Sequence, residues 1–286
     1  MGRNGQLRTF KNGTAIITGG ASGIGRSLAK ALAKRGCTVT LADLQYEMAE
    51  RVAKEIVRSG GSAAAVMLDV TDCHAVEAVV GEVSETYGRL DYMFNNAGIA
   101  INGKFFDFDL SDWQRCIDIN LLGVVHGVRS AYSIMEKQGF GHIVNTASIT
   151  GLYPWPTTFA YAATKYAIVG MTNILSAELQ GSGIYATVLC PGTIQTAVIE
   201  DGARRERWAG DYSEKKLKKF FSEVKGMDPD LFAEKAVRQI AKRKPIIAIP
   251  LGYKSLWWLN RLSPSLAISL SHRIYEIIIE RIADNE

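Results

Sequence analysis

Thr14-Ala-Ile-Ile-Thr18, followed at once by Gly19-Gly-Ala-Ser-Gly23-Ile-Gly25, is the stretch that decides how this chain folds. The first five residues are apolar and β-branched, which predicts a buried strand. Arg26 to Arg35 is rich in alanine and leucine, which predicts a helix. A strand, a glycine turn and a helix in succession indicate the first unit of a parallel sheet covered by helices.

The glycine turn predicts a phosphate site, because backbone N–H groups and a helix N-terminus meet there. We expect Gly19 to make the tight turn, Gly23 to allow close approach of a diphosphate, and Gly25 to let the helix pack on the sheet. The spacing is GxxxGxG, so a turn with a structural role alone is the alternative. The predicted phosphate contacts are Gly19, Ala21, Ser22, Gly23, Ile24 and Gly25.

The second predicted strand, Thr38 to Asp43, ends in a carboxylate. An acid about 20 residues beyond such a turn accepts hydrogen bonds from the adenosine ribose 2′-OH and repels a 2′-phosphate. Asp43 therefore favours NAD over NADP as the cofactor. The alternative is that Asp43 caps a helix starting near Gln45, and the two roles are compatible.

Strands and helices alternate with short links along the rest of the chain, which predicts a doubly wound parallel sheet in a single α/β domain over residues 1–286. The right-handed crossover rule places the strand ends, and any ligand, along one edge. The further strands expected are Ser62–Leu68, Leu90–Phe94, Gly141–Ala147, Gly183–Cys190 and Pro245–Pro250. The further helices expected are Glu47–Arg58, Asp72–Tyr87, Asp107–Ile119, Asn120–Lys137, a long helix bearing Tyr161, and Pro229–Lys242.

Composition limits the classes of function. The chain has 286 residues, 47% apolar and 22% charged, as in an ordinary globular protein. Its net charge of +4 is too small and scattered for a nucleic-acid site.

Four widely spaced cysteines without a CxxC pattern, and a polar start with no apolar signal segment, predict reduced thiols and a cytoplasmic location. The four histidines show no ligand spacing, so no metal site is expected.

Tyr161 and Lys165 lie four residues apart and thus on one face of a helix. A phenol with a pKa of about 10 is a poor acid or base near neutrality, and an adjacent ammonium lowers that pKa. The pattern alone also fits a core tyrosine beside a lysine whose stem is buried. Asn120 and Ser148 fall at element ends on the same predicted side, where each is equally compatible with a capping role.

The ordered set of these motifs resembles the short-chain dehydrogenase/reductase family, in its short single-domain branch, over roughly residues 12–195. The residues that carry the resemblance are Thr18-Gly19-x-x-x-Gly23-x-Gly25, Asn95-Asn96-Ala97-Gly98, Asn120, Ser148, Tyr161-x-x-x-Lys165 and Pro191-Gly192. The resemblance implies a Rossmann-like sheet of about seven strands and an oxidoreductase. Family members are commonly tetramers or dimers, so it also implies a homo-oligomer, for example a homotetramer.

The resemblance implies catalytic roles for four residues. Tyr161 would be the general acid in carbonyl reduction and the base in alcohol oxidation. Lys165 would lower the pKa of Tyr161 and hold the nicotinamide ribose. Ser148 would hydrogen-bond the substrate oxygen, and Asn120 would fix a water in a proton relay to Lys165.

The resemblance implies further cofactor contacts at three strand ends. Asn96, Ala97 and Gly98 would support the sheet and face the adenosine side. Asp69 would bind the adenine, and Val70 would add a backbone contact. Pro191, Gly192 and Thr193 would line the nicotinamide pocket.

The C-terminal third suggests how the substrate is enclosed. The segment 193–227 has mixed charge, glycines and aromatics, which predicts a mobile lid. With Tyr153, Trp155 and Phe159 it predicts an apolar substrate pocket, unless these aromatics are ordinary core. The extension 252–286 carries apolar residues at helical spacing, broken by Pro264. It is expected to cover the pocket, pair subunits or lie on a membrane; few cations favour an intramolecular or subunit contact over membrane association.

These observations predict NAD(H)-dependent interconversion of a lipophilic secondary alcohol and its ketone, steroid-, retinoid- or aryl-like. One alternative is an epimerase or dehydratase of the longer-chain relatives, which the GxxxGxG spacing and the lack of a further substrate domain disfavour. The other is a catalytically silent dinucleotide-sensing scaffold, which would have no need of Asn120, Ser148, Tyr161 and Lys165 together.

Overall fold

The computed structural model describes residues 7, 9–196, 206–210 and 212–282. Its central feature is a parallel sheet of seven strands, counted within these residues. Its strands in spatial order are β3 (Ser62–Met67), β2 (Thr38–Asp43), β1 (Thr14–Thr18), β4 (Tyr92–Asn95), β6 (Gly141–Thr146), β7 (Ile184–Pro191) and β9 (Ile246–Ile249). Every adjacent pair is parallel. The strand order reverses between β1 and β4, where open α/β sheets bind ligands.

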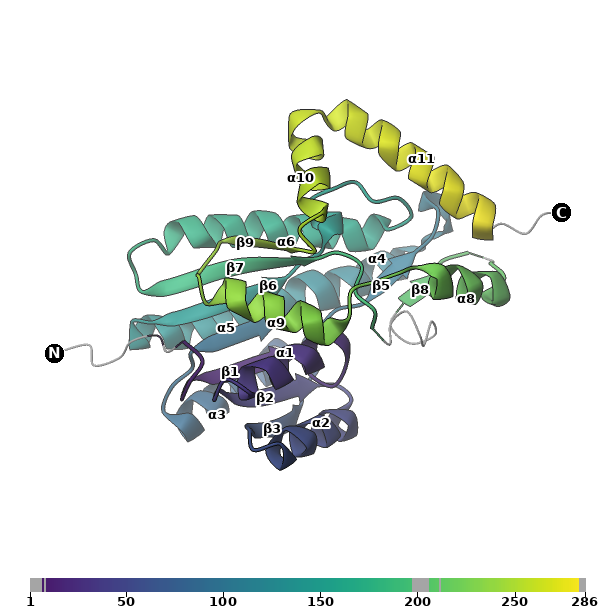
Figure 1. The fold of residues 1–286 in the computed structure, drawn as a ribbon. Helices are drawn as coiled ribbons and strands as arrows, with labels where there is room; N and C mark the ends of the chain where they lie inside the picture. Colours follow the sequence, from purple (N-terminus) through teal and green to yellow (C-terminus); the bar gives the residue numbers. More distant parts are fainter. Residues whose placement is uncertain (1–6, 8, 197–205, 211, 283–286) are drawn as a thin grey trace.

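Helices cover both faces of this sheet (Figure 1). Alternate residues of β1 point to opposite faces, so Ile17 packs in one apolar cluster and Ile16 in the other. The first cluster includes α1 (Gly23–Ala33), α2 (Tyr46–Arg58) and α9 (Pro229–Ile240). The second includes α3 (Cys73–Tyr87), α5 (Gly123–Gln138) and α6 (Phe159–Glu178). The predicted doubly wound parallel sheet is confirmed.

Several predicted boundaries were displaced. The first helix begins at Gly23, three residues before the expected Arg26, so the last two glycines of the turn belong to its first turn. No helix start occurs at Asn120. Instead α4 (Leu110–Cys116) runs through a π-helical segment, Ile117–Leu122, directly into α5. The Asn120 side chain bonds the backbone of Ile99 rather than capping a helix, which explains why the capping role was wrong.

A second, smaller sheet was not predicted. Strand β5 (Ala100–Asn102) pairs in parallel with β8 (Glu206–Trp208). Strands of three residues are too short to show an alternating pattern. The helix α8 (Glu214–Glu223) follows β8, and two single 3₁₀ turns occur at Phe105–Asp107 and Ile149–Gly151.

The C-terminal extension forms two helices, α10 (Tyr253–Leu262) and α11 (Pro264–Ile282), and Pro264 separates them as expected. Figure 1 shows α10 rising from the end of β9, and α11 running from its tip toward α8. Arg281 of α11 forms an ion pair of 3.5 Å with Glu223 of α8. The extension thus packs on its own chain. Within the described residues, no helix has the length and apolar character needed to span a bilayer.

Candidate active site

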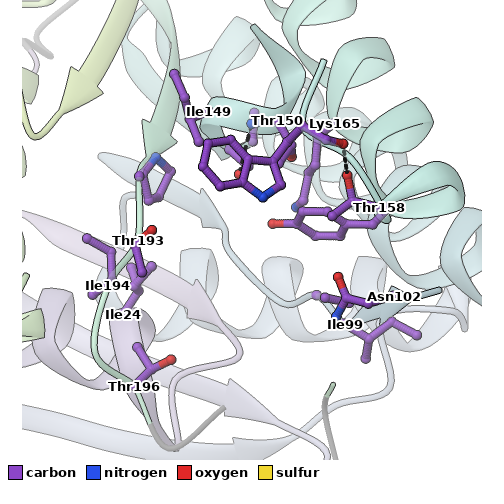
Figure 2. Close-up of a pocket in the computed structure, with 18 of the residues that line it drawn as sticks. Ile24, Ile99, Asn102, Ile149, Thr150, Thr158, Lys165, Thr193, Ile194 and Thr196 are labelled. Carbon is purple, nitrogen blue, oxygen red and sulfur yellow. Dashed lines mark hydrogen bonds between the residues drawn. The ribbon is translucent and has the colours of Figure 1, made fainter. Parts of the chain in front are cut away.

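A cavity of about 410 Å³ opens at the carboxyl ends of β1, β4, β6 and β7. It brings together segments more than 170 residues apart in sequence, from Gly19 to Thr193. Thirteen of the predicted site residues line it: Gly19, Ser22, Gly23, Ile24, Asn96, Ala97, Gly98, Ser148, Tyr161, Lys165, Pro191, Gly192 and Thr193. Figure 2 shows Ile24, Thr193, Ile194 and Thr196 on one side of the cavity and Thr150, Thr158 and Lys165 on another.

The glycine turn forms one end of the cavity. Gly19 and Gly23 have φ angles of +67° and +52°, a conformation that side chains disfavour. A Cβ on Gly25 would lie 2.1 Å from the Gly19 carbonyl oxygen, so only glycine allows α1 to approach the turn this closely. The N-cap residue Ser22 does not cap α1 with its side chain. Ser22, Gly23 and Ile24 at this helix end line the cavity, and the predicted phosphate contact there remains a prediction.

Thr18 joins the glycine turn to the end of β4. Its Oγ1 accepts hydrogen bonds from the N–H groups of Asn96 (2.9 Å) and Ala97 (3.0 Å). Asn96 Nδ2 donates in return to the Thr18 carbonyl at 3.1 Å. The turn Asn95–Gly98 is thus held against the glycine turn at the switch point of the sheet.

Asp43 lies at the end of β2 and is 5% exposed. Its Oδ2 accepts from the N–H of Ala21 at 3.0 Å, and its Oδ1 accepts from the N–H of Gln45 at 2.9 Å. Gln45, not Asp43, is the N-cap of α2, so the alternative capping role is not observed. Asp43 instead bonds Ala21 of the glycine turn and does not line the cavity.

Asp69 and Val70 follow β3, and neither lines the cavity. Asp69 Oδ1 accepts from the N–H (2.9 Å) and hydroxyl (2.7 Å) of Thr71. The Val70 carbonyl oxygen accepts from His126 Nδ1 at 2.9 Å. Their predicted contacts with the adenine remain predictions.

Tyr161 and Lys165 lie one turn apart on α6, and both line the cavity. The Lys165 Nζ is 5.4 Å from the centre of the Tyr161 ring and donates to the Thr146 carbonyl at 2.9 Å. Lys165 is only 3% exposed, and this burial lowers its pKa to about 8. The nearby thiols of Cys190 and Cys116 oppose that shift. The pair therefore places a cation beside a phenol at neutral pH.

Asn120 is completely buried within the π-helical segment, which places its amide toward β5. It accepts from Ile99 N–H and donates to the Ile99 carbonyl, both at 2.9 Å. A Cβ on Gly98 would lie 3.0 Å from Asn120 Oδ1 and 3.6 Å from Lys165 Nζ. Asn120 and Lys165 thus flank the same glycine, although Asn120 does not line the cavity.

Ser148 follows β6 and is 8% exposed. Its Oγ accepts from the N–H of Thr150 at 3.2 Å, so it caps the 3₁₀ turn Ile149–Gly151. The same side chain lines the cavity, and a hydroxyl that accepts this bond still has its own proton to donate. The capping role and the predicted catalytic role are compatible.

Thr157 lines the cavity in a left-handed conformation with φ +64°, which is a strained geometry for a β-branched residue. Its carbonyl oxygen accepts from Gly103 N–H at 2.8 Å, so the strained residue joins β5 to the loop before Tyr161. No sequence pattern signals this position.

The aromatic residues expected around the substrate divide into two groups. Trp155, Trp208 and Phe220 line the cavity. Tyr153 is fully buried and Phe159 is 40% exposed, and neither lines it. Tyr212 donates to Asp107 Oδ2 at 2.7 Å, away from the lining. The part of the expected lid over 197–205 lies outside the described residues, as does residue 211.

Three lining residues from the C-terminal extension were not assigned to the site by sequence: Tyr253, Ile274 and Ile278. The ring of Tyr253 occupies the place of a Cβ on Gly192, only 2.4 Å from that position, and its hydroxyl is 3.0 Å from Thr193 Oγ1. The helical spacing of apolar residues indicated a buried face in this segment, but not what that face covers. Across the described residues, no group of histidine, cysteine and carboxylate side chains is arranged to hold a metal.

Comparison with known proteins agrees with this geometry. Residues 13–207 match the family model described as short chain dehydrogenase. The probable oxidoreductase EphD of Mycobacterium tuberculosis is 33% identical over 268 residues, and the match covers 91% of this chain but 45% of EphD. The chain therefore spans about half the length of this curated relative.

Two solved structures are also similar. A short chain dehydrogenase/reductase from Burkholderia phymatum in complex with NAD has a TM-score of 0.82 and 28% identity, covering 91% of this chain and 96% of that one. A putative NAD(P)-dependent gluconate 5-dehydrogenase from Beutenbergia cavernae, with bound NADP, has a TM-score of 0.73 and 27% identity over 87% and 100% of the chains. The chain thus belongs to the short-chain dehydrogenase/reductase family of oxidoreductases.

Proposed function

We propose that this protein is an NAD(H)-dependent oxidoreductase that interconverts a secondary alcohol and a ketone. The observation that carries the proposal is the single cavity that joins the glycine turn to Ser148, Tyr161 and the buried Lys165. The glycine turn suits a dinucleotide diphosphate, because Gly19, Ser22 and Gly23 line this cavity at the N-terminus of α1, where an anion is favoured. The bound nicotinamide would supply or accept the hydride.

The residues of this chain would manage the proton. In ketone reduction, Tyr161 donates its phenolic proton to the carbonyl oxygen as that oxygen gains negative charge. In alcohol oxidation, the phenolate takes the hydroxyl proton. Ser148 donates a hydrogen bond to the same oxygen and stabilises the developing charge.

Lys165 would supply the charge that makes Tyr161 effective. An ammonium group near a phenol favours the phenolate and lowers the phenol pKa. With its own pKa of about 8, Lys165 is mostly protonated at neutral pH. Asn120 would fix a water in a proton relay to Lys165; its amide holds the backbone of Ile99, and both Asn120 Oδ1 and Lys165 Nζ lie near the adjacent Gly98.

The cavity favours an uncharged, lipophilic substrate. Among the described residues that line it, Lys165 is the only charged one. Aliphatic and aromatic side chains form much of the remaining wall, including Ile99, Ile149 and Trp155. A substrate carboxylate or phosphate would lose its hydration here, and the lining cation, Lys165, is already bonded to the Thr146 carbonyl and lies near the Tyr161 ring.

We propose NAD rather than NADP as the cofactor, although the similar solved structures include one with NAD and one with NADP. Asp43 supports NAD, because its buried carboxylate is held at the glycine turn by the N–H of Ala21. A negative charge there would repel a 2′-phosphate.

We also propose that the protein is cytoplasmic and that it forms a homo-oligomer, either a dimer or a tetramer. The four cysteines, which are all described, are unpaired, as expected in a reducing compartment. Phe106 and Leu110 are 93% and 86% exposed, which supports a covered surface between subunits.

The decisive experiment replaces Tyr161 by Phe. Turnover with NADH and a panel of uncharged ketones should fall at least about 100-fold, because the proton donor is removed. NADH binding, followed by fluorescence titration, should be unchanged. Titration of the wild type with NADPH should give weaker binding than with NADH.

The matched control is Tyr166→Phe, five residues further along the same helix, whose hydroxyl lies 3.5 Å from Asn260 Nδ2. It should retain turnover. Full activity of Tyr161→Phe would contradict the mechanism, and tighter binding of NADPH would contradict the cofactor assignment.

A further inference from the structure

We propose that α8 and α11 form a subsite for the hydrocarbon part of the substrate, and that Ile274 and Ile278 set its size limit. The inference rests on the proposed ketone and alcohol chemistry and assigns the part of the substrate remote from the reacting carbon.

One stripe of α11 faces the cavity. Ile274 and Ile278 are four residues apart, so their side chains lie on the same face, and both line the cavity. Ile278 is 7% exposed. Ile268 and Ile277, on other faces of the same helix, are 61% and 52% exposed. The difference separates the cavity-facing stripe from the solvent-facing residues.

The facing wall comes from α8 and from the loop before Tyr161. Phe220 and Val224 line the cavity in and directly after α8, again four residues apart. Trp155 lines it from the loop. None of these five side chains carries a charge, so the space between them suits a hydrocarbon group rather than a polar one.

Hydrogen bonds hold α11 to the loop that bears Trp155. Tyr153 Oη donates to the Ala267 carbonyl at 3.0 Å, and Ser271 Oγ donates to the Pro154 carbonyl. The loop lies between Ser148 and Tyr161 in sequence. The wall of α11 is therefore fixed relative to the proposed reacting groups, and its side chains can limit substrate length.

The experiment measures kcat/KM with NADH for methyl ketones of increasing alkyl chain length. Ile274→Ala with Ile278→Ala should raise the preference for the longest ketones over the shortest by about tenfold, because methylene-sized changes in an apolar pocket have effects of this order. Ile278→Trp should lower that preference by a similar factor of about ten. NADH affinity should stay constant in both variants.

The control variants are Ile268→Ala and Ile277→Ala, which remove equal volume from the exposed faces of α11. Each should leave the chain-length preference unchanged. If kcat/KM in the Ile274 and Ile278 variants fell by the same factor for short and long ketones, the two residues would have a merely structural role and the inference would be overturned. An equal change of the chain-length preference in Ile268→Ala or Ile277→Ala would also overturn the inference.

A second readout separates this inference from the proposed function. Binding of a long-chain secondary alcohol to the NAD⁺-saturated protein is measured by the shift in thermal unfolding temperature. If the wild type binds NADH but turns over no ketone, the proposed function fails. The subsite then stands if Ile278→Trp abolishes the shift given by the alcohol while Ile277→Ala keeps it, and it falls if the two variants behave alike.

Discussion

The cavity has two ends that are built in different ways. At the end proposed to bind the cofactor, here called the cofactor end, backbone and short polar side chains of β1, α1 and the turn after β4 contact one another, with Thr18 and Gly19 at the centre. At the roof, large apolar side chains of α8 and α11 form the wall. Hydrogen bonds attach α11 and the preceding α10 to residues 152–154: Tyr153 Oη donates to the Ala267 carbonyl, Ser271 Oγ donates to the Pro154 carbonyl, and Asn260 Nδ2 donates to the Leu152 carbonyl.

Because of this difference, we expect the two ends to tolerate amino-acid substitutions to different extents. A wall made of backbone cannot move when a methyl group is added, because the neighbouring atoms are themselves fixed by the sheet. A wall made of side chains changes shape with each substitution while its helix stays in place. Substitutions at the cofactor end should therefore be poorly tolerated, whereas substitutions at the roof should change the shape of the cavity.

The largest effect is expected at Gly25. The Cβ of Gly25→Ala would lie 2.1 Å from the Gly19 carbonyl oxygen and 2.7 Å from Asn96 Nδ2. Overpacking of this kind destabilises by about 1–3 kcal/mol or more and should displace α1 from the turn. NADH titration should show weaker binding, and thermal unfolding should show a lower unfolding temperature.

Gly81→Ala is its control, because a Cβ on this α3 glycine meets nothing within 4 Å. It should stabilise the protein by about 0.5–1 kcal/mol through helix propensity. Normal NADH binding by Gly25→Ala would show that the cofactor end is as adaptable as the roof.

An intermediate effect is expected at Lys165, on the boundary between the two ends. Burial lowers its pKa from 10.5 to about 8. Below pH 8 the lysine is protonated in both the folded and the unfolded state, so the full penalty of burying its charge applies. Between about pH 8 and 10.5 the unfolded state holds more protons, so the free energy of unfolding rises with pH.

The buried thiols act in the opposite direction at higher pH. Burial raises the pKa of Cys190 from 9.0 to about 12, which lowers stability as the unfolded thiol ionises. Comparison with Lys165→Met isolates the lysine. The wild type should gain stability relative to this variant as pH rises from about 8, as measured by urea unfolding. A constant difference across that range would contradict the buried ammonium.

The smallest effect is expected at the roof. Tyr153→Phe removes the hydrogen bond to the Ala267 carbonyl and should lower stability by about 1 kcal/mol. NADH affinity should not change, because the bond lies at the other end of the cavity. Tyr132→Phe, whose exposed hydroxyl bonds Glu136, is the control for loss of a phenol and should change stability by less than about 0.5 kcal/mol. A loss of NADH binding in Tyr153→Phe would show that the two ends are coupled.

The same contrast explains what could be predicted from the sequence. The strands of the large sheet and the Tyr161–Lys165 pair follow from local patterns: apolar runs, a glycine turn and a four-residue spacing. Close packing of the first helix at Gly25 was also predicted from the sequence, because close backbone contact needs glycine.

Other parts of the site depend on contacts between distant segments. The π-helical segment around Asn120 forms where its amide meets Ile99, which no periodicity indicates. The pairing of β5 with β8 joins three residues to three. Ile274 and Ile278 show an apolar helix face, but only the folded chain brings that face to the cavity.

The contact between Tyr253 and the turn at Gly192 and Thr193 has a consequence for exchanging parts between relatives. Tyr253 is the first residue of α10, yet its ring fills the space beside a turn that belongs to the sheet. A chimera that takes its roof from another family member should therefore place the junction after Tyr253. A junction before Tyr253 would replace this side chain together with α10 and α11, and the turn at Gly192 and Thr193 would lose its contact with the Tyr253 ring.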